Sequence, residues 1–247
     1  MTNMKPHTFR YDYQPALAQT IKQMVQQALA EDLNTLKDGS DITAELIPEL
    51  QQIKATLISR EAGILCGKDW FNAVFKQLDG DVKINWMADD GDRLNAGMEI
   101  CRLQGSARAI LTGERTAMNL LQTLSGTATV TAQYVAQLTG SNCRLLDTRK
   151  TIPGFRLAQK YAVTCGGGHN HRIGLFDAFL IKENHILACG GIAKAVRQAN
   201  DNHPEHPVEV EVENLAELEQ ALNADADVIM LDNFSNADKI AAVRLNQ

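Results

Sequence analysis

The chain has 247 residues, of which 45% are hydrophobic and 22% charged, values typical of a globular protein with a sizeable core. No run approaches the ~20 apolar residues of a membrane-spanning helix, and residues 1–15 lack the apolar core of a signal peptide. The net charge of −6 disfavours general nucleic-acid binding. Five widely spaced cysteines without a CxxC pair indicate reduced thiols and disfavour a zinc site, because ligand pairs at zinc-finger spacing are missing. We therefore expect a cytoplasmic protein that binds neither membranes nor nucleic acids.

The first half of the chain predicts a mixed α/β domain. The expected helices cover residues 16–33 and 68–78, and strand-like runs cover residues 54–66 and 82–103. A long helix is expected over residues 106–138, with Ser106 as its N-cap and an interruption near Gly126. We place the domain boundary near the start of this helix, so that residues 1–112 form an N-terminal α/β (α+β) sandwich domain.

From Cys143 onward, strand-like and helical segments alternate, which predicts parallel βα units in an open sheet or a barrel. The expected strands cover residues 144–146, 178–181, 208–212 and 228–231. The expected helices cover residues 155–163, 192–200, 215–222 and 236–245. Residues 113–247 are therefore predicted to form an open, incomplete TIM-like α/β barrel after the N-terminal domain.

Positive charge is concentrated in one segment. Residues 144–182 contain seven cations and two carboxylates, a net charge of +5, which leaves −11 for the rest of the chain. The cations are interleaved with the glycines and histidines of "CGGGHNHR" over residues 165–172, and glycine lets the backbone approach an anion closely. This favours an anion-binding site over a solvated surface. His169 and His171 have no further metal ligand nearby, so we expect one to be structural and the other to contact substrate.

Polar residues follow the expected strands, where the active sites of βα folds lie. Residues 147–150 follow the first strand, Lys182 the second, Glu211 lies near the end of the third, and Asp232 follows the fourth. Cations and carboxylates at the ends of successive strands are hard to explain as packing. The pattern therefore favours an enzyme.

The run "VEVEVE" places Glu209, Glu211 and Glu213 on one face of the third expected strand. Parallel strands covered by helices are usually apolar on both faces. The acidic face must therefore meet solvent, cations or a metal. On an edge strand it would be ordinary surface, but together with Asp232 it favours a Mg²⁺ site with oxygen ligands.

Four segments carry a resemblance to a known family. They are "GERTAMNLLQTLSGTAT" over residues 113–129, "LLDTRKTIPGFRLAQKYAVTCGGGHNHRIGLFDAFLIKENH" over residues 145–185, "VEVEVE" and "IMLDN". In order and spacing they resemble quinolinate phosphoribosyltransferases over nearly the whole chain. The resemblance implies an N-terminal α/β domain followed by an open α/β barrel, in a homodimer with shared active sites; a higher oligomer stays open. It also implies that the family continues beyond Gln247 with barrel units that bind the ribose 5′-phosphate.

The resemblance implies a glycosyltransferase (a pentosyltransferase) of pyridine nucleotide and NAD biosynthesis. Phosphoribosyl transfer from phosphoribosyl pyrophosphate to quinolinate, with decarboxylation, would give nicotinate mononucleotide, pyrophosphate and CO₂. Arg149, Arg172 and Lys182 would surround the pyridine dicarboxylate, with His171 beside it. Arg115 would reach across from the partner subunit of the homodimer. Arginine suits this role because its planar fork binds both oxygens of a carboxylate.

The resemblance also assigns the chemistry of the leaving group. Lys150 would face the substrate and the departing pyrophosphate. Glu211 and Asp232 would hold Mg²⁺ on phosphoribosyl pyrophosphate. The catalytic residues would then be Lys150, Lys182, Glu211 and Asp232.

Three alternatives stay open at this point. Lys182 at a strand end could form a Schiff base in an aldolase-type barrel, although the neighbouring cations disfavour it. A close paralogue could keep the fold and use another ring acid or serve metal uptake. A non-catalytic binding protein is disfavoured by the intact set of site residues.

Overall fold

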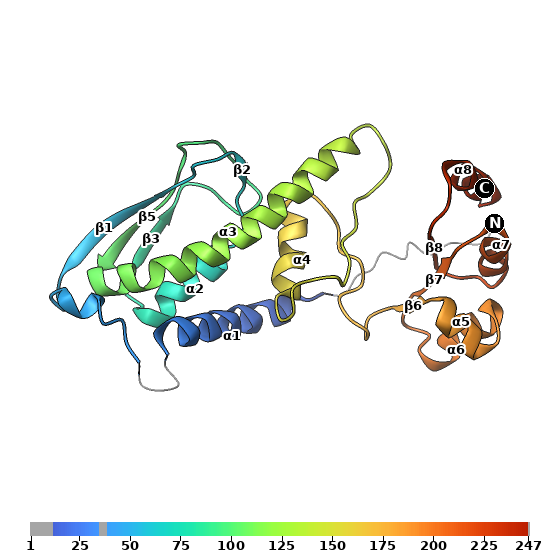
Figure 1. Ribbon diagram of the computed structural model, residues 1–247, viewed down its shortest axis with the longest axis horizontal. Helices are drawn as coiled ribbons and strands as arrows, with labels where there is room; N and C mark the ends of the chain where they lie inside the picture. The colour runs from blue at the N-terminus through green and yellow to red at the C-terminus, as the bar shows by residue number, and fades with distance from the viewer. Residues whose placement is uncertain (1–11, 35–38, 247) are drawn as a thin grey trace. The chain divides into compact units, whose positions relative to one another are not determined.

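The computed structural model describes residues 12–34 and 39–246 (Figure 1). The chain divides into two compact units, an N-terminal unit over Asp12–His171 and a C-terminal unit built on Arg172–Gln247. The first is a mixed α/β unit, and the second is an open parallel α/β sheet. The predicted fold class, an α/β domain followed by an open, incomplete α/β barrel, is confirmed. The expected domain boundary at residue 112 stays a prediction.

The N-terminal unit contains an antiparallel sheet with the strand order β1-β5-β3. Its strands are β1 (Gln52–Ile58), β5 (Glu99–Ser106) and β3 (Lys83–Trp86), and a short pair, β2 (Gly63–Ile64) and β4 (Arg93–Leu94), lies in a separate ladder. The central strand β5 buries Ile100, Cys101 and Leu103. Strands therefore form within both of the strand-like runs predicted over residues 54–66 and 82–103.

Helices α1 (Gln14–Leu33), α2 (Lys68–Leu78) and α3 (Ala107–Gln137) pack together in this unit, and a 3₁₀ turn covers Ala44–Leu46. The Ser106 hydroxyl accepts a hydrogen bond from the Ala109 amide at 3.3 Å, so the predicted N-cap is confirmed. The predicted interruption near Gly126 is wrong, because α3 is continuous over 31 residues. A glycine lowers the stability of a helix by only about 1 kcal/mol. Leu121, Leu124 and Ala128 are buried on either side of Gly126, so packing holds the helix together there.

The segment between α3 and α4 (Arg156–Cys165) is irregular, so the strand expected over residues 144–146 is wrong. Only one parallel bridge forms there, between Leu146 and His169. The Asp147 amide donates to the His169 carbonyl at 3.0 Å, and the His169 amide donates to the Leu145 carbonyl at 2.9 Å. The segment thus pairs briefly with the stretch after α4 instead of extending the parallel sheet.

The C-terminal unit is a three-stranded parallel sheet with the order β6-β7-β8 (Figure 1). Its elements are β6 (Phe179–Ile181), α5 (Glu183–Cys189), α6 (Ile192–Asn202), β7 (Val208–Val212), α7 (Leu215–Asn223), β8 (Val228–Leu231) and α8 (Asn236–Leu245). The predicted strands and helices of this unit are confirmed, except that the pattern missed α5. Because β7 lies between β6 and β8, the alternative that it is an edge strand is wrong.

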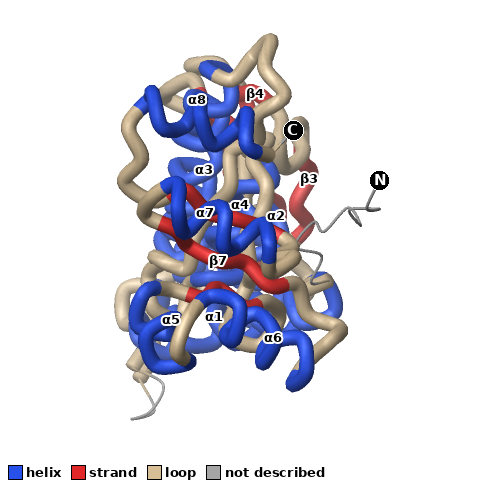
Figure 2. The backbone as a smooth tube through the Cα atoms, turned by 90° about the vertical axis from the view of Figure 1, so that its right-hand side faces the viewer, coloured by secondary structure: helices blue, strands red, loops and turns tan. Residues whose placement is uncertain are grey.

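The core of the C-terminal unit lies on the valine face of β7. Val208, Val210 and Val212 are fully buried, and α6 and α7 pack against this strand (Figure 2). Ile192 of α6 and Leu218 of α7 belong to the same buried cluster as these valines. The alternating glutamates consequently point to the other face of the sheet.

Among the described residues, no helix combines the length and the apolar character that crossing a membrane requires.

Candidate active site

A lysine and a glutamate meet at the carboxyl ends of β6 and β7. The register pairs Ile181 with Val210, so the next residues, Lys182 and Glu211, are neighbours on adjacent strands. The Lys182 Nζ donates to the Glu211 Oε2 at 2.6 Å, with side-chain exposures of 46% and 16%. Of the surroundings expected for the acidic face, which are solvent, cations or a metal, Glu211 meets a cation at this position.

Asp232 extends the same arrangement to the third strand. The register pairs Glu211 with Met230, and residues two apart on a strand share a face, so Asp232 belongs to the face of Glu211. Its backbone amide donates to the Val212 carbonyl at 2.9 Å, and its Oδ2 accepts from the side-chain Nδ2 of Asn233 at 2.9 Å. Two carboxylates, one at the end of β7 and one directly after β8, therefore share one face of the sheet.

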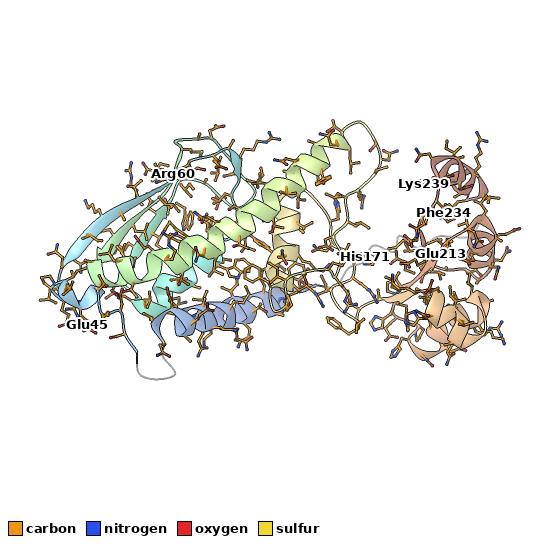
Figure 3. All side chains as sticks on the ribbon, viewed as in Figure 1. Glu45, Arg60, His171, Glu213, Phe234 and Lys239 are labelled. Atoms are coloured by element: carbon orange, nitrogen blue, oxygen red, sulfur yellow. The ribbon has the colours of Figure 1, made fainter. Side chains whose placement is uncertain are left out.

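The three glutamates of β7 differ in their access to solvent. Glu209 is 3% exposed, Glu211 is half-buried, and Glu213, labelled in Figure 3, is exposed beyond the strand. The face is thus closed at its amino end and open at its carboxyl end. Glu211 and Asp232 are both half-buried and lie at the carboxyl ends of β7 and β8.

A buried polar network organises the expected substrate-binding segments of the N-terminal unit. The Lys160 side chain is fully buried, forms an ion pair with Asp147, and donates to the His171 carbonyl at 3.0 Å. Asp147 also accepts from the His171 amide at 2.9 Å and from the Asn170 side-chain amide at 2.6 Å. One carboxylate therefore ties residues 169–171 to the segment that carries Arg149. Neither Lys160 nor Asp147 was predicted as a site residue.

Arg149 and Lys150 follow Asp147 directly and are positioned differently. The Arg149 Nε is buried and has no hydrogen-bond acceptor among the described residues. A buried guanidinium N–H without a partner is costly. Lys150 is exposed, and its amide donates to the Thr148 hydroxyl at 3.0 Å. Arg149 is therefore the stronger candidate for an anion that enters this unit.

His171 and Arg172 are both buried. His171 (Figure 3) is 7% exposed and ends the segment held by Asp147. The Arg172 Nη1 donates to the Ala178 carbonyl at 3.2 Å, so part of this guanidinium holds the turn that leads into β6. Asp177 closes that turn by accepting from the Ile173 and Gly174 amides, both at 2.8 Å. Their predicted contacts with substrate stay predictions.

Arg115 lies elsewhere in the N-terminal unit. It is exposed on α3 and lines a groove of about 770 Å³ between this helix and the segment over residues 56–65. None of the other expected substrate-binding residues of this unit, which are Arg149, Lys150 and His171, lines that groove. The groove and the Asp147 network are separate features of the unit.

The triple glycine has a packing role. A Cβ on Gly166 would lie 2.4 Å from the Ala128 carbonyl oxygen, and a Cβ on Gly168 would lie 2.7 Å from a methyl group of Val163. Gly167, between them, has a φ of +84°, which favours glycine. Close approach to α3 and α4 thus explains these glycines without an anion.

A cluster of titratable groups, formed by Cys66, Asp90, Tyr161 and Cys165, lies next to the triple glycine. It was not predicted from the sequence. Hydrogen bonding to Cys165 and burial raise the pKa of the Cys66 thiol, and the hydrogen bond from Cys66 lowers the pKa of Cys165. Burial raises the pKa of Asp90, whose Oδ2 accepts from the Tyr161 hydroxyl at 2.8 Å. Burial, followed by the charge of Asp90, raises the pKa of Tyr161. The members are distant in sequence, so no local motif announces them.

Comparisons with known proteins agree on one family. The model of the C-terminal domain of quinolinate phosphoribosyl transferase matches residues 127–247, and the model of its N-terminal domain matches residues 41–125. A nicotinate-nucleotide pyrophosphorylase (carboxylating) of Mycobacterium leprae is 40% identical over 213 residues, which cover 85% of this chain and 74% of that protein.

Solved structures give the same result. The nicotinate-nucleotide pyrophosphorylase of Francisella tularensis has 52% sequence identity and a TM-score of 0.87, covering 92% of this chain and 79% of that chain. NadC of Streptococcus pyogenes has 41% identity and a TM-score of 0.88, covering 96% of this chain and 82% of that chain. The chain therefore belongs to the quinolinate phosphoribosyltransferase family.

Proposed function

We propose that this chain performs the reaction of its family. It transfers the phosphoribosyl group of phosphoribosyl pyrophosphate to quinolinate and releases pyrophosphate and CO₂, leaving nicotinate mononucleotide for NAD biosynthesis. The observation that carries the proposal is the grouping of Lys182, Glu211 and Asp232 at the carboxyl ends of three adjacent parallel strands. This is the position of the active site in βα folds.

Each unit offers cations for the anionic groups of the two substrates. In the N-terminal unit, Arg149 has a buried Nε that a carboxylate would satisfy, and Lys150 is free to approach pyrophosphate. In the C-terminal unit, Lys182 is half-exposed and can exchange Glu211 for a substrate anion. We propose that Arg149, Arg172 and Lys182 bind the dicarboxylate and that His171 contacts it.

Glu211 and Asp232 fit a Mg²⁺ ion that is shared with phosphoribosyl pyrophosphate. Mg²⁺ is commonly held by one or two carboxylates, while water and substrate phosphates complete its shell. Two carboxylates on one sheet face meet this requirement. When bound, the ion would neutralise charge on the leaving pyrophosphate.

The proposed mechanism requires positioning and charge more than covalent chemistry. The pyridine nitrogen of quinolinate displaces pyrophosphate from the ribose carbon, and positive charge develops on the sugar in the transition state. Lys150 and Lys182 stabilise the charge of the departing group. The ring nitrogen then carries positive charge, so the adjacent carboxylate leaves as CO₂ and its electrons stay on the ring carbon.

We further propose a homodimer in which Arg115 acts across the interface. Arg115 lies on an exposed stripe of α3 that also contains Leu111 and Val130, which are 43% and 51% exposed. It lines a groove separate from the other expected site residues of its unit. A partner subunit that covers this stripe would receive the guanidinium in its own site.

Subunit mixing tests the homodimer. Arg115→Ala and Lys182→Ala should each be nearly inactive, and a mixed dimer should regain activity because one of its sites has both residues intact. Lys239→Ala, on the exposed face of α8, is the matched lysine control and should stay active. Absence of recovery after verified subunit exchange would remove Arg115 from the partner's site.

A coupled assay tests the reaction itself. The purified protein is incubated with quinolinate, phosphoribosyl pyrophosphate and Mg²⁺, and CO₂ and nicotinate mononucleotide are measured together. We expect equal yields of the two products and none without Mg²⁺. Nucleotide formation without CO₂ would mean that quinolinate accepts the phosphoribosyl group and keeps both carboxylates, which would contradict the decarboxylating reaction. Trapping of Lys182 by borohydride with a carbonyl substrate would favour the Schiff-base alternative.

We also propose a cytoplasmic location, which the five free thiols support.

A further inference from the structure

A second group of possible metal ligands lies at the opposite end of β7 from Glu211. The loop over residues 203–207, with the sequence His-Pro-Glu-His-Pro, joins α6 to β7. The His206 amide donates to the His203 carbonyl at 3.2 Å, which closes a turn, and the Pro207 carbonyl accepts from the Phe179 amide at 3.0 Å. The loop is thus fixed to the amino ends of β6 and β7, away from the proposed active site.

The side chains of this loop converge on one carboxylate oxygen. The Glu205 Oε1 lies 3.5 Å from the His203 Nδ1 and 3.4 Å from the His206 Nε2. All three ligand atoms lie within 4.8 Å of one another. Metal–ligand bonds of about 2.0–2.1 Å in a tetrahedral zinc site place neighbouring ligand atoms roughly 3.3–3.4 Å apart. Two of the three separations between ligand atoms in the loop, 3.4 and 3.5 Å, are close to this value.

The surroundings of the cluster suit an open metal site. The side-chain exposures of His203, Glu205 and His206 are 58%, 61% and 33%, so an ion and its water ligand have direct access. The His203 ring contacts the Phe179 ring at a centroid distance of 6.0 Å, and the two histidine rings lie 5.7 Å apart. Packing on β6 and the two flanking prolines limit the movement of the rings and lower the entropy lost on binding.

The donor set selects the type of ion. Two imidazole nitrogens and one carboxylate oxygen suit Zn²⁺, Ni²⁺ and Cu²⁺, whereas Mg²⁺ prefers an all-oxygen shell. We propose that His203, Glu205 and His206 form a binding site for a borderline divalent cation such as Zn²⁺, with water in the remaining position. The site is independent of the proposed Mg²⁺ position, because it uses none of the same residues and lies at the other end of the strand.

Titration calorimetry of the full chain with ZnCl₂ tests the proposal, in excess Mg²⁺ so that oxygen-ligand sites are occupied. We expect one equivalent of Zn²⁺ to bind and the thermal midpoint to rise, since an ion that binds only the folded state stabilises it. His203→Ala, His206→Ala and Glu205→Gln should each weaken binding at least about tenfold. Glu219→Gln, an exposed glutamate on α7, is the matched control and should bind like the wild type.

Substitution of Co²⁺ for Zn²⁺ supplies an independent readout. A visible absorption band of tetrahedral Co²⁺ that is lost in His206→Ala supports the site and reports imidazole coordination. Absence of Zn²⁺ binding to the wild-type chain would overturn the proposal and leave the loop as two histidines that contact Glu205. Zn²⁺ binding that persists in the histidine variants and disappears in Cys66→Ser or Cys165→Ser would also overturn it, because the ion would then lie at the thiol cluster.

Discussion

The two units position their site residues in different ways. In the N-terminal unit, Arg149 and His171 lie on irregular segments, and a fully buried ion pair between Lys160 and Asp147 holds these segments together. In the C-terminal unit, Lys182 and Glu211 follow parallel strands, and the sheet register alone makes them neighbours.

The comparison separates two uses of an ion pair. Lys160–Asp147 is excluded from water, whereas Lys182–Glu211 is open to solvent on the lysine side. Removing one partner of a buried pair leaves an uncompensated charge, whereas an exposed pair contributes little to stability. We therefore expect the first pair to determine the folding of its unit and the second to determine chemistry.

The largest effect is expected for Lys160→Met, which leaves Asp147 charged and buried. The free energy of unfolding, measured by urea denaturation, should fall by about 3–5 kcal/mol. Lys160→Met combined with Asp147→Asn should recover part of this loss because the buried charge is removed. Lys239→Met on α8 is the control for a lysine substitution as such and should stay within about 0.5 kcal/mol of the wild type. A loss as small as that of the control would contradict the role of the pair.

The next effect concerns binding. Arg149→Met removes the guanidinium with the unpaired Nε and should weaken quinolinate binding by about 1.5–3 kcal/mol, the contribution of a charge-assisted hydrogen bond. Calorimetry measures this, with Arg144→Met, an exposed arginine five residues earlier, as the control. The wild type should also bind nicotinate, which lacks the second carboxylate, far more weakly than quinolinate. Equal affinities for the two acids would refute the assignment of two carboxylates to these cations.

A smaller effect on stability, with a large one on activity, is expected for Glu211→Gln. Because Lys182 is half-exposed, loss of the pair should cost about 0–1 kcal/mol of unfolding free energy. The Mg²⁺ concentration required for activity should nevertheless rise, while quinolinate binding is retained. Asp232→Asn should behave in the same way. Wild-type Mg²⁺ dependence in both variants would reduce the acidic face to ordinary surface.

Much of the architecture was predictable because its signals are local. The periodic helix over residues 68–78 and the strands over residues 208–212 and 228–231 have the predicted bounds. The proximity of Lys182 and Glu211 was also predictable, because the carboxyl ends of neighbouring parallel strands lie at the same edge of the sheet. These features depend on spacing along the chain, which a sequence displays directly.

What the sequence did not disclose depends on the path of irregular segments. Lys160 belongs to a cationic run that was interpreted as part of an anion site, yet it is fully buried on Asp147. The strand expected at residues 144–146 is reduced to one bridge with His169, and the triple glycine packs on helices. Each of these outcomes requires knowing which residues from distant parts of the chain come together.

The smallest effect concerns Asp90, whose carboxylate accepts hydrogen bonds from two backbone amides and the Tyr161 hydroxyl. Its Oδ1 accepts from the Gly67 and Lys68 amides at 3.0 and 3.2 Å, and burial raises its pKa above the ordinary value. A raised pKa means that the folded state binds the proton more tightly than the unfolded state does. The stabilising contribution is therefore complete below the unfolded pKa of about 3.9 and is lost as the pH rises through the higher folded pKa.

Two substitutions should change this pH dependence in opposite directions. Asp90→Asn keeps an oxygen for the two backbone amides and cannot ionise, so the unfolding free energy should fall less as the pH rises through this range. Tyr161→Phe removes the hydrogen bond that lowers the pKa of Asp90, so the fall should be steeper and extend to higher pH. Urea denaturation at several pH values between acid and neutral measures both. If all three curves run parallel, the protonation of Asp90 does not differ between the folded and unfolded states, and the carboxylate acts only as an acceptor for the first turn of α2.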